Sequence, residues 1–319
     1  MPTTDRSVRS SGAAGRSILI AGPTASGKSA LALALAERLG GTVINADSMQ
    51  VYRELSILTA RPTGAETSRA PHRLYGHVAA REAYSAGRFV REAGAAIAEA
   101  HQQGRVAIVV GGTGLYLKAL TEGLSPIPPI PEPVRGYWRE RAQALGADDL
   151  YRELCSRDPT MARRLASGDV QRITRALEVL EATGRSLAAW QAIPAAPAPG
   201  VERARRLVVH CERGELSRRI DERFQRMMAA GALDEVRALL ALALPPALPA
   251  MRALGVAPLA RHLTGQIGLE EAVARGQAES RQYAKRQLTW LRRNMITWNA
   301  IDAQEIERTT AAILSFIDF

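Results

Sequence analysis

The sequence of 319 residues has few aromatic side chains, two cysteines and no long apolar run. Aromatic residues make up 5% of a chain that is 46% hydrophobic, so its core must consist mainly of Ala, Leu, Val and Ile. This suits an α/β or helical protein better than a β-sandwich. Cys155 and Cys211 show neither metal-ligand spacing nor a disulfide framework, which indicates a reducing compartment. Because no apolar run approaches the length of a membrane span, we expect a cytoplasmic protein with no membrane partner.

Positive charge is in excess, but it identifies no partner by itself. The net charge is +10 and the isoelectric point about 10.3, which is compatible with nucleic-acid binding. A GC-rich genome, which favours Ala and Arg, would give the same charge. Residues 1–16 are polar and lack a secretory apolar core, so we expect a disordered tail.

A glycine-bounded loop follows the first apolar run and precedes a run rich in Ala and Leu, which predicts a strand, a loop and a helix. The pattern G-x-x-x-x-G-K-S is formed by Gly22, Pro23, Thr24, Ala25, Ser26, Gly27, Lys28 and Ser29. In such loops, successive backbone N–H groups and the helix N-terminus hold anionic oxygens. Lys28 adds a charge for the outer phosphate, and the Ser29 hydroxyl can ligate Mg²⁺. The pattern therefore predicts a di- or triphosphate site with Mg²⁺, without identifying the molecule.

Two further expected strands, residues 42–46 and 105–110, place polar groups near this loop. Ligands of open parallel sheets bind at the carboxyl ends of the strands. Asp47 follows one strand; a turn or a helix N-cap is the alternative role for such a residue. Many phosphate-loop ATPases carry an Asp after the other strand, but here Gly111-Gly112-Thr113-Gly114 follows. This disfavours a motor ATPase or GTPase and leaves Asp47 as the acidic group nearest the loop.

Two proline-rich linkers frame a helical segment. We expect residues 126–200 to form a helical insertion that moves as a lobe, and residues 17–125 with 201–319 to form the core. Asp158-Pro159 and Asp169 are typical helix starts. The helix after Asp169 places Gln171, Arg172 and Arg175 on its outer side, either for binding or as a solvated charged face.

The last third of the chain predicts two basic amphipathic helices. The first carries Arg219, Arg223 and Arg226 beside an apolar stripe. The second, from Glu279 to Asn294, interleaves arginines and lysine with Tyr283 and Trp290. Two interpretations of the second helix stay open, a surface that contacts phosphate backbones and a solvated face over a core.

Taken together, these blocks resemble the tRNA dimethylallyltransferases, or tRNA isopentenyltransferases. The matching blocks are GPTASGKS (22–29), INADSMQVY (44–52), PHRL (71–74), VGGTGLYLKAL (110–120), DVQRITRALEV (169–179) and RQYAKRQLTWLR (281–292). The phosphate loop alone is generic, whereas D-S-x-Q-V-Y, G-G-T and Q-R-x-x-R-A-L-E together are specific. The chain departs from the family at Ile57-Leu58-Thr59-Ala60-Arg61-Pro62, where I-G-T-A-K-P is usual, and at Leu254-Gly255-Val256.

The resemblance implies a P-loop NTPase-like α/β core, with a parallel sheet flanked by helices, and a helical insertion that clamps tRNA. It implies a monomer that uses Mg²⁺ and transfers a dimethylallyl group from dimethylallyl diphosphate to tRNA. The acceptor would be the N6 amine of the adenosine 3′-adjacent to the anticodon, in tRNAs that read codons beginning with U. The anticodon stem-loop would be the part of tRNA that is bound.

The same resemblance implies roles for individual residues. The phosphate loop, with Arg219 and Arg223, would hold the donor diphosphate, Asp47 would be the general base, and Thr113 would position the reacting groups. The residues expected to contact tRNA are Asp47, Ser48, Met49, Gln50, Thr113, Arg135, Gln171, Arg172, Ile173, Thr174, Arg175, Arg281 and Lys285.

Two other hypotheses stay open. A small-molecule kinase of the phosphate-loop class would use Asp47 as base on a hydroxyl and residues 126–200 as a lid, but it leaves the basic C-terminal helix unexplained. An RNA-binding protein with a vestigial loop is disfavoured by the intact Gly27-Lys28-Ser29.

Replacing Arg172 and Arg175 together by Ala should weaken tRNA binding and flatten its salt dependence. Each lost phosphate contact removes about one unit from the slope of log affinity against log salt, and somewhat less for single-stranded RNA. Binding titrations at several salt concentrations measure this slope. An affinity and a slope equal to those of the wild type would mean that this helix face is merely solvated.

Overall fold

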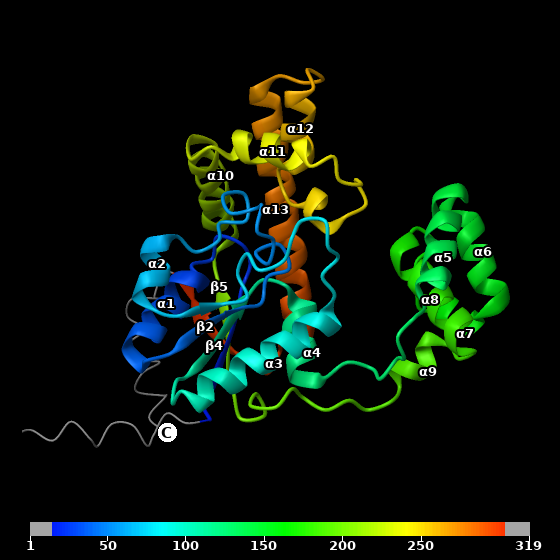
Figure 1. Ribbon diagram of the computed structural model, residues 1–319, viewed down its shortest axis with the longest axis horizontal. Helices are drawn as coiled ribbons and strands as arrows, with labels where there is room; N and C mark the ends of the chain where they lie inside the picture. The colour runs from blue at the N-terminus through cyan, green and yellow to red at the C-terminus, as the bar shows by residue number, and fades with distance from the viewer. Residues whose placement is uncertain (1–14, 304–319) are drawn as a thin grey trace, which may run out of the picture. The chain divides into compact units, whose positions relative to one another are not determined.

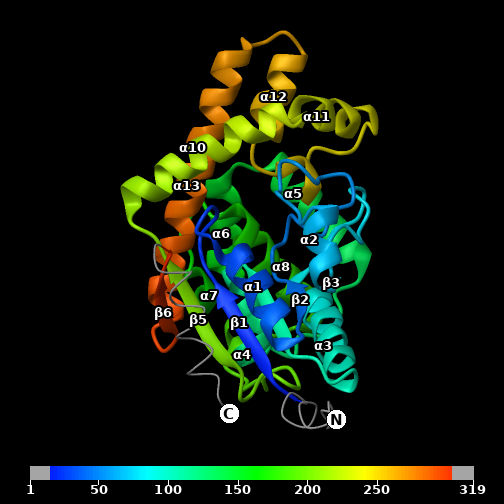
Figure 2. The same ribbon diagram turned by 90° about the vertical axis from the view of Figure 1, so that its left-hand side faces the viewer.

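The computed structural model describes residues 15–303, and their strands form one parallel sheet in the order β3-β2-β4-β1-β5-β6 (Figure 1). The strands are β1 (Ser17–Ala21), β2 (Thr42–Asn45), β3 (His72–Arg73), β4 (Ala107–Gly111), β5 (Arg205–His210) and β6 (Asn299–Asp302). Figure 2 shows β1, β5 and β6 side by side, as their pairing requires. The predicted α/β class is confirmed. The predicted tail lies outside the described residues, except for Gly15 and Arg16.

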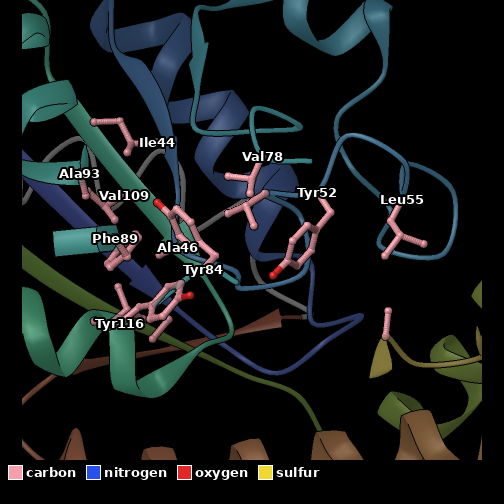
Figure 3. Packing of buried hydrophobic residues seen from close by; sticks show 14 of the residues in the cluster. Ile44, Ala46, Tyr52, Leu55, Val78, Tyr84, Phe89, Ala93, Val109 and Tyr116 are labelled. Atoms are coloured by element: carbon pink, nitrogen blue, oxygen red, sulfur yellow. The ribbon is translucent and has the colours of Figure 1, made fainter. Parts of the chain in front are cut away.

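Helices cover both faces of the sheet. Those of the compact unit that runs to Thr121 and resumes at Pro197 are α1 (Lys28–Leu39), α2 (Gly64–Arg69), α3 (Ala86–Gln102), α4 (Gly114–Glu122), α10 (Arg213–Ala229), α11 (Ala232–Ala241), η2 (Pro249–Arg252), α12 (Val256–Leu263) and α13 (Leu269–Asn294). In β1, Ile18 and Ile20 pack with α1, whereas Leu19 and Ala21 belong to the larger core that includes α3 and α4. Burial on both faces explains the near-continuous apolar runs of these strands. Figure 3 shows part of the larger core, in which the rings of Phe89 and Tyr116 stack with centroids 4.2 Å apart.

The register of the central strands brings three loops to one edge of the sheet. Ala21 at the end of β1 is level with Gly111 of β4, and Asn45 at the end of β2 is level with Val110. A Cβ on Gly111 would overlap the backbone of Ala46, so only glycine permits β2 and β4 to approach this closely. The segments that follow β1, β2 and β4 therefore start side by side.

Residues Glu122–Ala196 form a second compact unit that consists of helices. Its helices are α5 (Glu132–Ala144), α6 (Ala147–Arg157), α7 (Pro159–Ala162), α8 (Val170–Thr183) and α9 (Leu187–Gln191). Trp138, with no exposed surface, lies in a core to which α5, α6 and α8 contribute. Both predicted helix starts are confirmed, because the carboxylates of Asp158 and Asp169 accept hydrogen bonds from the backbone N–H groups of Met161 and Arg172. Over residues 15–303, no helix has the length and apolar character needed to cross a membrane.

The last long helix begins earlier than the sequence predicted. The expected start was Glu279, but α13 begins at Leu269, where Glu270 and Glu271 complement the partial positive charge of the helix N-terminus. Gly276 is a poor helix former and obscures the periodicity. Its role is steric, because a Cβ at this position would overlap the Phe224 ring of α10.

Two mid-helix glycines should respond to alanine in opposite directions. Gly276→Ala should lower the free energy of unfolding by about 1–3 kcal/mol, because the added methyl group displaces Phe224. Gly94→Ala in α3 is the matched control, since no atom lies within 4 Å of the added Cβ. It should raise stability by about 0.5–1 kcal/mol. Denaturant titrations of both variants give the comparison, and a Gly276 variant as stable as the Gly94 variant would contradict the close packing of α10 on α13.

Candidate functional site

The phosphate-loop pattern forms a tight turn between β1 and α1. Gly27 has a φ of 88° and Ala25 a φ of 62°, so the loop curls through left-handed conformations before α1 begins at Lys28. A Cβ on Gly22 would lie 2.8 Å from the Ser26 hydroxyl, which is itself buried and has no hydrogen-bond partner among the described residues. The Lys28 ammonium donates to the carbonyl oxygen of Pro23 at 3.1 Å, within its own loop.

Three charged side chains influence one another beside this loop. Burial lowers the pKa of Lys28 to about 8; the Asp47 carboxylate opposes this shift, and the Arg223 guanidinium adds to it. Burial also lowers the pKa of Arg223, with Asp47 again acting in the opposite direction. Arg223 reaches the loop directly, donating to the Thr24 hydroxyl at 3.2 Å. One carboxylate thus faces two partly desolvated cations, and an added anion would find an electrostatically favourable place.

Asp47 is held in a turn directly after β2. Its backbone N–H donates to the side-chain oxygen of Asn45 at 2.8 Å, and its Oδ1 accepts from the backbone N–H of Met49 at 2.9 Å. The other oxygen, Oδ2, accepts no hydrogen bond from residues 15–303. Asp47 therefore does lie in a turn, which was one of the two roles that its sequence position left open. The turn fixes the carboxylate and leaves Oδ2 available to a ligand.

Thr113 connects the segments after β2 and β4. Its Oγ1 accepts from the backbone N–H of Ser48 at 2.9 Å and donates to the Ser48 hydroxyl at 3.2 Å. Tyr283 of α13 lies close to the Thr113 side chain, which lowers the pKa of this tyrosine, whereas burial, the larger effect, raises it. Thr113 is thus hydrogen-bonded to Ser48, beside the turn that carries Asp47, and has Tyr283 as a neighbour.

A cavity of about 860 Å³ opens beside the phosphate loop and the turn that carries Asp47, and Thr113 lies outside its lining. The predicted site residues that line it are Thr24, Lys28, Ser29, Asp47, Ser48, Met49, Gln50 and Arg223. Three residues that were not among the predicted site residues also line the cavity: Arg61, Tyr283 and Arg226, the last predicted only as part of a basic stripe. One surface therefore combines the cationic loop, the carboxylate and several hydrogen-bonding groups.

A segment spanning Ser56 to Thr63, here called the wall segment, forms one side of the cavity. The Glu235 carboxylate of α11 accepts from three consecutive backbone N–H groups, those of Ser56, Ile57 and Leu58, at 2.6–2.9 Å. The Gln50 amide donates to the next two carbonyl oxygens, of Thr59 and Ala60, at 2.9 and 3.0 Å. This role of Glu235 could not be predicted from the sequence, because its hydrogen-bond partners lie more than 170 residues away in the chain.

Other predicted residues of this unit lie outside the cavity lining. The Arg219 guanidinium pairs at 2.6 Å with Glu215, one helical turn earlier on α10. Arg281 pairs with Asp221 of α10, and the Lys285 side chain is exposed on α13. Pro23 and Ser26 are buried in the frame of the phosphate loop. Of the two arginines that were predicted to bind the donor diphosphate, Arg223 lines the cavity and Arg219 does not.

The remaining predicted residues belong to the helical unit. Arg172, with 73% of its side chain exposed, pairs with Asp169 at 3.1 Å, and the less exposed Arg175 pairs with Glu178 at 3.2 Å. Gln171 is exposed and Arg135 is half-buried. Ile173 and Thr174 are buried in this unit, so their side chains support α8 from inside.

The fold and the cavity define an α/β protein of the phosphate-loop class, with a carboxylate beside its anion site. A family model described as IPP transferase matches residues 50–294, and one of the TIP49 P-loop domain matches residues 4–54. A tRNA dimethylallyltransferase of Parvibaculum lavamentivorans is 52% identical over 304 residues, which cover 95% of this chain and 96% of that protein. The chain therefore belongs to the tRNA dimethylallyltransferase (IPP transferase) family, and the resemblance inferred from its motifs is confirmed.

Solved structures agree with this assignment. The tRNA isopentenylpyrophosphate transferase of Bacillus halodurans is 31% identical, with a TM-score of 0.67, and the match covers 94% of this chain and 96% of that one. A eukaryotic dimethylallyltransferase acting on tRNA is 29% identical, with a TM-score of 0.77 and coverage of 90% and 74%.

Binding of inorganic diphosphate should weaken as the pH rises above about 8, the pKa of Lys28. Below that pH the ammonium is charged in both the free and the bound protein. Above it, binding must take up a proton, and the affinity falls by about tenfold per pH unit. Diphosphate itself gains charge with pH, so the profile is compared with that of Lys28→Met, which should bind weakly and lack this fall. Calorimetry between pH 6.5 and 9.5 measures both, and parallel profiles would show that Lys28 does not contact the anion.

Proposed function

We propose that the protein transfers the dimethylallyl group of dimethylallyl diphosphate to the N6 amine of the adenosine 3′-adjacent to the anticodon, in tRNAs that read codons beginning with U. The observation that carries the proposal is that Lys28 and Asp47 line the same cavity. An anionic leaving group and a base can therefore face one reaction volume. Membership of the family supplies the substrate classes.

The donor would bind with its diphosphate on the phosphate loop. The backbone N–H groups at the start of α1, the Lys28 ammonium and the Arg223 guanidinium would all contact phosphate oxygens. As the allylic C–O bond breaks, negative charge grows on the diphosphate. Cations that were desolvated before the reaction stabilise this charge without reorganising, and so lower the barrier.

Oxygen ligands suited to Mg²⁺ are present at the same place. The Ser29 hydroxyl lies in the first turn of α1 and lines the cavity, where it would hold the ion. Within residues 15–303, no cluster of three His, Cys, Asp or Glu side chains could hold a metal, so the ion would share its coordination with the diphosphate. Bound there, Mg²⁺ would neutralise part of the charge on the leaving group.

Asp47 would act on the acceptor. The lone pair of an exocyclic adenine amine is delocalised into the ring, so this amine is a poor nucleophile and gains from a base that takes its proton as the new bond forms. The oxygen Oδ2 has this capacity, since only Oδ1 is used in the turn. Thr113 and Ser48 would orient the amine or the donor from the adjoining segment. The adenine would have to leave the anticodon stack to reach the cavity.

The helical unit would clamp the anticodon stem-loop. Arg172 and Arg175 are exposed enough to exchange their carboxylate partners for phosphates, and the exposed Gln171 lies on the same helix. Residues 126–200 would act as this clamp, and residues 17–125 with 201–319 as the catalytic core. We further propose that the enzyme works as a monomer in the cytoplasm, where tRNA is modified.

The phosphate loop alone does not distinguish a nucleotide from an allylic diphosphate, but membership of the tRNA dimethylallyltransferase family disfavours the alternative of a small-molecule kinase. Gly111 and Gly112 occupy the place where many phosphate-loop ATPases carry their acidic residue. A parallel incubation with labelled ATP and no prenyl donor would expose a kinase.

The test is transfer of label from dimethylallyl diphosphate to unmodified tRNA in a single turnover. The wild type should label the tRNA, and Asp47→Asn should lower the rate by roughly 10²- to 10⁴-fold, the usual contribution of a general base, with tRNA affinity nearly unchanged. Asp234→Asn, an exposed aspartate of α11, is the control and should react at the wild-type rate. An unlabelled tRNA would reject the proposed function, and an Asp47 variant within a few-fold of the wild type would remove Asp47 from the mechanism.

A further inference from the structure

One face of α13 contacts both the phosphate loop and the segment Gly112–Gly114. Tyr283, Gln287 and Trp290 are spaced four and three residues apart, so they lie above one another on the same side of the helix. Tyr283 lies close to the Thr113 side chain, and a Cβ on Gly114 would overlap the Trp290 ring. These two aromatic residues are neighbours of the Thr113–Gly114 segment, while Gln287 reaches further, into the phosphate loop.

Gln287 connects the two loops through a single amide group. Its Oε1 accepts from the backbone N–H of Thr24 at 2.9 Å, and its Nε2 donates to the backbone oxygen of Gly112 at 2.8 Å. The residue is only 6% exposed, so neither hydrogen bond is readily replaced by water. A Cβ on Gly112 would overlap Nε2, and thus only glycine admits the amide here.

The two hydrogen-bond partners of Gln287 lie next to groups with different proposed roles, Thr24 next to the donor site and Gly112 next to Thr113. Thr24 accepts a hydrogen bond from Arg223 and belongs to the loop that would hold the donor. Gly112 precedes Thr113, which is bonded to the segment that carries Asp47. A change in the separation of the two loops would therefore change the distance between donor and base.

We propose that Gln287 is a positioning residue, which fixes the phosphate loop relative to the Gly112–Gly114 segment and so sets the distance over which the allyl group is transferred. The inference rests on the proposed function. Gln287 touches neither substrate in this scheme and acts through Thr24 and Gly112. A misplacement of about 1 Å can cost on the order of 100-fold in rate, so two hydrogen bonds suffice for a large effect.

Methionine and glutamate at this position separate positioning from general structural support. Gln287→Met keeps the length of the side chain but makes neither hydrogen bond, and its single-turnover rate should fall by about 10- to 100-fold while the KM for tRNA changes less than about twofold. Gln282→Met, at an exposed glutamine of the same helix, should react like the wild type.

Gln287→Glu supplies a conservative variant whose hydrogen bonding depends on pH. Protonated, a glutamic acid accepts from Thr24 and donates to Gly112 as the amide does; ionised, it would oppose the Gly112 oxygen. Burial raises the pKa of such a carboxyl group. The rate of this variant relative to the wild type should therefore increase as the pH is lowered from about 8 to 5.5. The neighbouring ionisable groups Asp47, Lys28, Arg223 and Tyr283 are the same in every variant, so rate ratios, with Gln287→Met as a further reference, isolate the effect of residue 287.

Several outcomes would overturn the proposal. One is a Gln287→Met variant with a lower melting temperature but a wild-type rate, and another is a Gln287→Glu ratio that does not vary with pH. Binding of inorganic diphosphate gives a readout independent of transfer, because freeing the Thr24 N–H loosens the loop. Its affinity should fall about 3- to 10-fold in Gln287→Met, and an unchanged affinity would reject the link to the phosphate loop. If the wild type transfers no label, the proposed function fails, and the diphosphate measurement still decides the role of Gln287.

Discussion

The site depends on the burial of Lys28 beside Asp47, at the edge where the strands of a parallel sheet end. Because β1, β2 and β4 are neighbours in register, the loops that follow them cannot avoid one another. Burial lowers the pKa of the Lys28 ammonium, and Arg223 acts in the same direction. Asp47 opposes both, but one carboxylate cannot balance two cations. The loop therefore has an excess of positive charge, which a bound anion would neutralise; in the proposed reaction, the growing charge on the leaving diphosphate would be stabilised by the same cations.

Features encoded within a few residues could be predicted from the sequence. The phosphate loop, the strand before it and the helix after it follow from one contiguous pattern, and so do the N-caps Asp158 and Asp169. The position of Asp47 after a strand, together with the absence of a carboxylate after β4, was enough to place it near the loop. Its fixation by Asn45 is local as well. Because β1, β4 and β2 are adjacent in the parallel sheet, the phosphate loop and Asp47 come to line one cavity.

Features that depend on contacts between distant segments could not be predicted in the same way. Arg219 and Arg223 lie on one stripe of α10, yet only Arg223 reaches the phosphate loop. A local signal did exist for Arg219, since Glu215 lies four residues before it and holds it in an ion pair. No local signal marks Gln287, whose partners lie more than 170 residues away. Tyr283 and Trp290 stood out as aromatic residues among cations. Trp290 lies against Gly114, whereas Tyr283 lies near Thr113 and also has the exposed Arg286 guanidinium over its ring, 5.6 Å from the ring centroid.

The wall segment shows how a site tolerates departures from a family pattern. Its sequence differs from the usual one at Leu58 and at Arg61, both of which line the cavity. The backbone, however, is held by side chains from elsewhere, because Glu235 binds three consecutive N–H groups and Gln50 binds the next two carbonyl oxygens. Arg61 itself donates to the backbone oxygens of residues 52 and 53, which draws its charge towards the protein. The frame of the segment is thus fixed by groups outside it, and residues 58 and 61 contribute side chains to the surface of the cavity.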